Sequence, residues 1–263
     1  MRELAGLAVR TRRGDGDSVL WIHGYTLDAT SWQDLWEKLP AWNHVGIDLP
    51  GHGASRPFTA DETLPDLGRA IGAAAQVHGI RYLVALSVGT IVALQVAIEY
   101  PHAFSAIVLG APALGGGPQD PDARRVYEQV VRRFQHGRSG ADLREVWMGE
   151  DSPLFRGLER CAQRWDRVAA IVDRHSWREL SDGGMFRLTN HVQRREDLAR
   201  IASALLLLVG EQDMLAFRRS AEVIRRAVPS ATRVYLPDVG HLCMLQTPEL
   251  AAAHIERHLR AHA

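Results

Sequence analysis

Short apolar runs alternate with amphipathic stretches along most of the chain. Apolar runs rich in Val, Ile and Leu are typical of buried strands, whereas Ser31–Leu39 carries apolar residues at helical spacing. This stretch opens on Ser31-x-x-Asp34, which resembles a capping box at a helix start. The predicted strands are residues 19–22, 44–48, 81–86, 105–109, 204–209 and 233–236, and the predicted helices are residues 31–39, 64–78, 88–100, 217–228 and 248–260. Such alternation predicts an α/β fold, with a mostly parallel twisted sheet and helices on both faces.

Residues 115–198 interrupt this alternation. They begin with the turn-rich sequence Gly-Gly-Gly-Pro-Gln-Asp-Pro and continue with helical patterns that contain no good strand. We therefore expect residues 1–114 and 199–263 to form one α/β core, and residues 115–198 to be a helical cap inserted into it.

Composition excludes several classes of protein. The 31 basic residues balance the 31 acidic ones, so the chain lacks the net basic field expected of a nucleic-acid-binding or membrane-surface protein. Two cysteines form neither a disulfide framework nor a metal cluster. No apolar run approaches the roughly 18 residues that span a bilayer, and the first residues show no signal-peptide pattern. We expect a cytoplasmic protein without metal or cofactor, acting on a small-molecule substrate.

A serine, a carboxylate and a histidine follow three of the predicted strands. Ser87 follows strand 81–86, Asp213 comes shortly after strand 204–209, and His241 after strand 233–236. Because functional groups gather beyond the carboxyl ends of parallel strands, these three side chains are expected at one edge of the sheet. A serine hydroxyl becomes a nucleophile when a histidine takes its proton and a carboxylate orients that histidine. The pattern predicts a catalytic triad.

Each of these residues also has a simpler interpretation. Ser87 is equally suited to cap the helix that follows it. Asp213 lies where it can cap the helix near residue 217, and Glu211 and Asp238 are rival carboxylates. The sequence Ala-Leu-Ser-Val-Gly around Ser87 departs from the nucleophile-elbow pattern Gly-x-Ser-x-Gly at Ala85.

The chain resembles the α/β-hydrolase superfamily over essentially its whole length, in particular its small capped bacterial members. The resemblance rests on His23-Gly24, Asp-Leu-Pro-Gly-His-Gly-Ala-Ser at residues 48–55, the elbow at Ser87, Gly-x-x-Asp213 and Gly-His241. The order Ser, Asp, His is that of the superfamily. The resemblance implies that Ser87, Asp213 and His241 are catalytic. It also implies that the backbone N–H groups of Tyr25 and Val88 form the oxyanion hole.

Further residues are candidates for the substrate pocket. We expect Gly24, Trp147 and His191 to bind substrate, and Tyr25 either to pack in the pocket wall or to offer its phenol to the substrate. The aromatic residues Trp147, Phe155, Trp165, Trp177 and Phe186 either line an acyl pocket or form the core of the cap. The pairs Arg124-Arg125 and Arg132-Arg133 either receive an anionic or carrier-bound substrate or form a solvated helix face. Cys243 fits a small buried hydrophobe better than a redox group.

Three functions are consistent with the sequence. The first is a serine hydrolase that cleaves a carboxylic ester, lactone or thioester of a small-to-medium apolar acid through an acyl-enzyme on Ser87. The second is a non-hydrolytic enzyme or a carbon–carbon bond lyase, hydrolase or cyclase, in which His241 is the general base and Ser87 only donates a hydrogen bond. The third is a ligand-binding protein that has kept the fold without catalysis.

Overall fold

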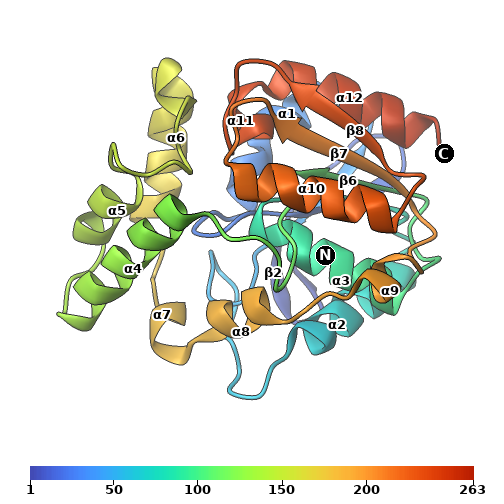
Figure 1. Ribbon diagram of the computed structural model, residues 1–263. Coiled ribbons are helices and arrows are strands. Elements are labelled where there is room, and N and C mark those ends of the chain that lie inside the picture. Colours follow the sequence, from blue (N-terminus) through green and yellow to red (C-terminus); the bar gives the residue numbers. More distant parts are fainter.

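The computed structural model describes residues 1–263, and an eight-stranded sheet forms its centre (Figure 1). The strands are β1 (Glu3–Leu4), β2 (Leu7–Arg12), β3 (Ser18–Ile22), β4 (Asn43–Ile47), β5 (Tyr82–Leu86), β6 (Ala106–Gly110), β7 (Ala204–Gly210) and β8 (Thr232–Leu236). They lie in the order β1-β2-β4-β3-β5-β6-β7-β8, and all neighbours from β4 to β8 pair in parallel. All six strands expected from the apolar runs are therefore present.

The sequence pattern missed β1 and β2, which add antiparallel strands at one edge of the sheet. In β2, the sequence Leu-Ala-Val-Arg-Thr-Arg offers no continuous apolar run, and only Leu7 in it is fully buried. An edge strand of this kind is half-exposed, so its composition does not separate it from a loop.

Helices cover both faces of the sheet. On one face lie α1 (Gln33–Lys38), α11 (Cys243–Gln246) and α12 (Pro248–Arg260), and on the other lie α2 (Leu64–Val77), α3 (Val88–Glu99), α9 (Arg195–Leu198) and α10 (Leu215–Ala227) (Figure 1). Strand side chains alternate between the two layers: Leu83 and Ala85 belong to the core under α2 and α3, whereas Val84 and Leu86 belong to the core under α1 and α12. The fold is thus the α/β arrangement expected from the sequence.

The chain between β6 and β7 forms helices and no strand. These are α4 (Pro121–Gln135), α5 (Ala141–Trp147), η2 (Leu158–Arg160), α6 (Ala162–Asp173), α7 (Glu179–Asp182), α8 (Gly184–Asn190) and α9. In Figure 1, α4, α5 and α6 stand beside the layered core, and α7 and α8 lead the chain back to it. We call residues 115–198 the cap segment.

None of the helices in the structure combines the length and the apolar character needed to cross a bilayer.

The predicted capping box at Ser31 is wrong. The helical segment begins earlier, with η1 (Ala29–Trp32), and Asp28 is its cap, because the Asp28 carboxylate accepts from the Thr30 N–H at 2.8 Å. The Ser31 hydroxyl instead donates to the backbone oxygen of Asp28. A complete capping box is found at the start of α2, where Thr63 and Asp66 satisfy each other's backbone N–H.

Candidate active site

Ser87 occupies a sharp turn between β5 and α3. Its φ is 52° and its ψ is −125°, a left-handed conformation that is strained for any residue other than glycine. The turn is fixed by a hydrogen bond of 2.9 Å from the Ser87 N–H to the oxygen of Gly110 in β6. Close packing against β3 requires Gly89, because a Cβ there would lie 2.5 Å from the carbonyl oxygens of Ile22 and His23. This is the strand-turn-helix geometry of a nucleophile elbow.

The structure brings Ser87, His241 and Asp213 into one hydrogen-bonded relay. His241 Nε2 lies 2.8 Å from Ser87 Oγ, and His241 Nδ1 lies 3.0 Å from Asp213 Oδ1. Asp213 Oδ1 also accepts from the N–H of Met214 at 2.7 Å, so the carboxylate does border the start of α10. All three side chains are buried, with Ser87 the most exposed at 8%. Neither rival carboxylate, Glu211 or Asp238, bonds to His241 in the structure.

Two backbone N–H groups near Ser87 are free to donate hydrogen bonds to an oxyanion. Val88 is the first residue of α3, so its N–H has no acceptor within the helix. The N–H of Tyr25 donates no hydrogen bond within the structure. The loop that carries Tyr25 lies against the elbow, because a Cβ placed on Gly24 would be 3.3 Å from Ser87 Cβ.

His23 ties this loop to the chain after β4 through both of its ring nitrogens. Its Nε2 accepts from the Leu49 N–H at 3.0 Å, so the proton is on Nδ1, which donates to the Gly24 oxygen at 2.8 Å. Burial lowers the pKa of His23, which favours this neutral form. His52 is also a buried structural residue, and Nδ1 of its ring bonds the Pro50 oxygen.

A cavity of about 610 Å³ opens above Ser87 and His241. Its walls are mostly apolar and come from both the core and the cap segment; they include Ile91, Leu154, Phe155, Met185, Phe217 and Leu242. Gly24 and Trp147 line the cavity as expected. The sequence alone does not indicate Met185 or Leu242, because no local pattern says which residues of a helix or loop face the cavity.

The structure does not bring His191 to the cavity. Thr189 and Asn190 line the cavity, but His191 follows the end of α8 and does not. Among the cap aromatic residues, Trp147, Phe155 and Phe186 border the cavity, whereas Trp165 and Trp177 do not. Trp177 is fully buried, so the cap aromatic residues divide between pocket wall and cap core.

Of the four paired arginines, only Arg124 and Arg132 border the cavity. Arg124 is largely exposed and forms an ion pair of 2.8 Å with Glu128.

Cys243 is free and buried, and burial raises the pKa of its thiol to about 12. It therefore behaves as the small apolar residue that the sequence suggested.

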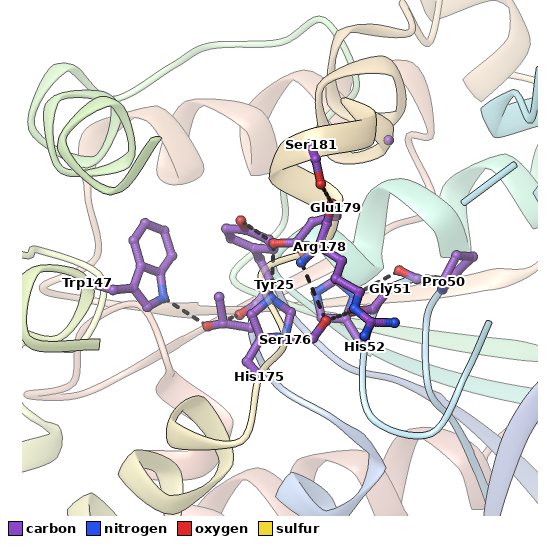
Figure 2. Close-up of polar contacts among 12 residues, drawn as sticks. Tyr25, Pro50, Gly51, His52, Trp147, His175, Ser176, Arg178, Glu179 and Ser181 are labelled. Atoms are coloured by element: carbon purple, nitrogen blue, oxygen red, sulfur yellow. Dashed lines mark hydrogen bonds and ion pairs between the residues drawn. The ribbon is translucent and has the colours of Figure 1, made fainter. Parts of the chain in front are cut away.

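Tyr25 packs in the cavity wall and does not offer its phenol to the cavity. Its hydroxyl donates to Glu179 Oε1 at 2.8 Å, on the cap segment (Figure 2). Burial and the nearby Glu179 carboxylate raise the pKa of Tyr25 well above its ordinary value, so the phenol stays protonated. The sequence does not indicate the Glu179 contact, because an acidic residue in a charged helical stretch carries no local sign of burial.

Comparison with known proteins agrees with this architecture. A family model described as the alpha/beta hydrolase family matches residues 19–254. A pimeloyl-[acyl-carrier protein] methyl ester esterase of Serratia marcescens is 27% identical over 95% of this chain and 96% of its own length. A 2-succinyl-6-hydroxy-2,4-cyclohexadiene-1-carboxylate synthase of Serratia proteamaculans is 29% identical over 97% of this chain and 98% of its own.

Solved structures show the same fold. A thermophilic esterase from Thermogutta terrifontis superimposes with a TM-score of 0.80 at 22% identity, covering 98% of this chain and 95% of that one. The match of the family model to nearly the whole chain, together with this fold, shows that the protein belongs to the α/β hydrolase family.

Proposed function

We propose that the protein is a serine hydrolase that cleaves carboxylic esters of small-to-medium apolar acids through an acyl-enzyme on Ser87. The observation that carries this proposal is the relay Ser87–His241–Asp213, with links of 2.8 and 3.0 Å, opening into a largely apolar cavity of about 610 Å³. The esterase from Serratia marcescens, 27% identical over nearly its full length, supports ester chemistry. Thioesters and lactones undergo the same acyl transfer and are included in the substrate range.

Acylation uses each part of the site. His241 Nε2 takes the proton of Ser87 as Oγ attacks the carbonyl carbon, and Asp213 stabilises the imidazolium that forms. The carbonyl oxygen becomes an oxyanion held by the N–H groups of Tyr25 and Val88; a single donor of this kind is typically worth roughly 2.7–4 kcal/mol. His241 then gives its proton to the leaving oxygen, and the alcohol departs as the ester bond to Ser87 Oγ is completed.

Deacylation repeats these steps with water. His241 removes a proton from a water molecule, which attacks the acyl-enzyme carbonyl, and the same N–H pair holds the second oxyanion. The proton returns to Ser87 Oγ, and the carboxylic acid is released. The cycle consumes one water molecule and restores the free serine.

The cavity supports an apolar acyl group. Its walls include Ile91, Leu242 and aromatic residues of the cap segment, and burial of each further methylene contributes about 0.8 kcal/mol. Arg124 and Arg132, on the cap helix α4, also border the cavity. Their positive charge makes a carrier-bound acyl group an alternative substrate to a free small ester.

A chain-length series tests this proposal. We expect p-nitrophenyl esters of about two to twelve carbons to be hydrolysed, with kcat/KM rising with chain length until the cavity is full. A fluorophosphonate probe should label Ser87. The Ser87→Ala variant should lose labelling and roughly 10⁴-fold or more in kcat, because the nucleophile is gone. A folded protein that neither hydrolyses these esters or matching thioesters nor takes up the probe contradicts the proposal; tight ligand binding without turnover would instead support a ligand-binding protein.

A second candidate is supported by the synthase from Serratia proteamaculans, which is 29% identical to this chain. In that case His241 acts as a general base in an elimination, cyclisation or carbon–carbon bond cleavage, and Ser87 only donates a hydrogen bond. Ser87→Ala would then keep a measurable rate, whereas His241→Ala would abolish it. Loss of activity in both variants favours the acyl-enzyme.

A further inference from the structure

A buried carboxylate links the cap segment to the loop of the oxyanion hole (Figure 2). Glu179, at the start of α7, is only 1% exposed. Its Oε1 accepts from the Tyr25 hydroxyl at 2.8 Å and lies 3.0 Å from His175 Nε2, while its Oε2 is buried without a hydrogen bond. Because a buried carboxylate is costly unless it is well paired, Glu179 is a poor choice if the position serves only to pack the cap.

The cap segment encloses the Tyr25 ring. Edge-on aromatic neighbours surround it with centroid distances of 5.3 to 6.4 Å; these are His52, Tyr127, Trp147, His175 and Trp177. All except His52 come from the cap segment. The ring is thus held on its sides, and Glu179 fixes its hydroxyl end.

A second contact fixes the backbone next to Tyr25. Trp147 Nε1 donates to Thr26 Oγ1 at 2.8 Å, and Thr26 Oγ1 donates to the Tyr25 carbonyl oxygen at 2.7 Å. Thr26 has a φ of 62°, so this part of the loop is strained and depends on its neighbours for its conformation. The cap segment therefore constrains Tyr25 at both its side chain and its peptide.

We infer that Glu179 is a positioning residue: by holding the Tyr25 hydroxyl it sets the direction of the Tyr25 backbone N–H, so that seating of the cap segment completes the oxyanion hole. This inference rests on the proposed acyl-transfer function. Glu179 touches neither substrate nor Ser87, and it acts only through Tyr25.

A neighbouring contact provides a matched control. Arg174, five residues before Glu179, also ties the cap segment to the core, since its Nε donates to Asp28 Oδ2 at 2.8 Å. It does not touch Tyr25. If contacts of the cap with the core were all that mattered, loss of Arg174 and loss of Glu179 would have similar effects on catalysis.

The test compares Tyr25→Phe, Glu179→Ala, Glu179→Gln and Arg174→Ala in the full-length protein. Each is assayed with the best p-nitrophenyl ester for kcat and KM. Each is also assayed for inhibition by a trifluoromethyl ketone of the same chain length, whose adduct with Ser87 places an oxyanion in the hole, and by the matching carboxylic acid. Thermal unfolding and active-site titration with the fluorophosphonate give the fraction of folded enzyme.

We expect Tyr25→Phe and Glu179→Ala to lower kcat by roughly tenfold, less than the loss of an oxyanion donor itself, with KM changed less than about twofold. The inhibition constant of the ketone should rise in the same proportion, and that of the acid should not. Glu179→Gln keeps an acceptor oxygen for Tyr25 and should restore most of kcat. Combining Tyr25→Phe with Glu179→Ala should cost little more than either alone, because both remove the same Tyr25–Glu179 hydrogen bond.

Three results would overturn the inference while the wild type is active: an unchanged kcat in Tyr25→Phe, an increase in KM at constant kcat, or an equal loss of kcat in Arg174→Ala. Tyr25→Phe removes a single oxygen, so it decides the matter even if Glu179→Ala does not fold. A wild type that is neither active nor labelled at Ser87 contradicts the proposed function itself, and the inference with it.

Discussion

The backbone at Ser87 is strained, and nothing in the local sequence indicates this strain. A left-handed φ costs a residue other than glycine about 1–3 kcal/mol, and the hydrogen bonds and packing around the elbow must offset this cost. Ala85, the departure from the elbow pattern, lies in the regular strand β5, where it pairs with Ile22 and Leu109 and is fully buried. Its methyl group fits the sheet, so the turn does not need glycine at that position. Glycine is required two residues after Ser87, at Gly89.

Cys243 lies two residues from His241, but its reactivity should be that of a buried thiol. Because its pKa is raised to about 12, almost none of it is thiolate at pH 8. Iodoacetamide should modify only the half-buried Cys161 in the native protein and both cysteines in denaturant. Mass spectrometry of Cys161→Ser should show no adduct before unfolding and one afterwards. Rapid native alkylation at Cys243 would contradict the structure.

At the scale of elements, two segments with the same local pattern behave differently. Ser31-x-x-Asp34 and Thr63-x-x-Asp66 both read as capping boxes, but only the second forms one. The difference arises because Asp28 starts the first helical segment three residues earlier. Pro65 in the first turn also suits the start of α2.

The contribution of the capping box at α2 to the stability of the protein can be measured directly. Thr63→Ala removes the side-chain acceptor for the Asp66 N–H and should lower the free energy of unfolding by about 1 kcal/mol. Thr63→Ser keeps the hydroxyl and should cost much less. Urea unfolding of both variants provides the measurement, and equal stability of Thr63→Ala and the wild type would show that the box contributes nothing.

For the whole molecule, buried neutral histidines should make stability depend on pH. Burial lowers the pKa of His44 from its usual 6.5 to about 4, and it also lowers the pKa of His23 and of His52. Below pH 6.5 these histidines take up protons in the unfolded chain but not in the folded protein. Their contribution to stability is therefore complete above pH 6.5 and is lost as the pH falls.

Because this stability is lost as the pH falls, the free energy of unfolding should rise with pH in this range. Between about pH 6 and pH 4 the free energy of unfolding should fall, with His44 contributing up to about 1.4 kcal/mol per pH unit. Urea unfolding at pH 7.5, 6.5, 5.5 and 5.0 tests this expectation, and His44→Gln should give a shallower slope. Stability that stays constant or increases between pH 7 and pH 5 would contradict it.

The sequence by itself determined the parallel sheet and the edge at which Ser87, Asp213 and His241 meet. Strand-helix alternation is a local property, and parallel strands place their carboxyl ends at one edge, so chain order alone brings these residues together. Only the tertiary structure decided which residues of the cap segment contact the core and the cavity. Glu179 bonds Tyr25 across 154 positions of sequence, and His191 misses the cavity that its neighbour Asn190 lines. No local period encodes such contacts, because they depend on how the helices of the cap segment pack against the core.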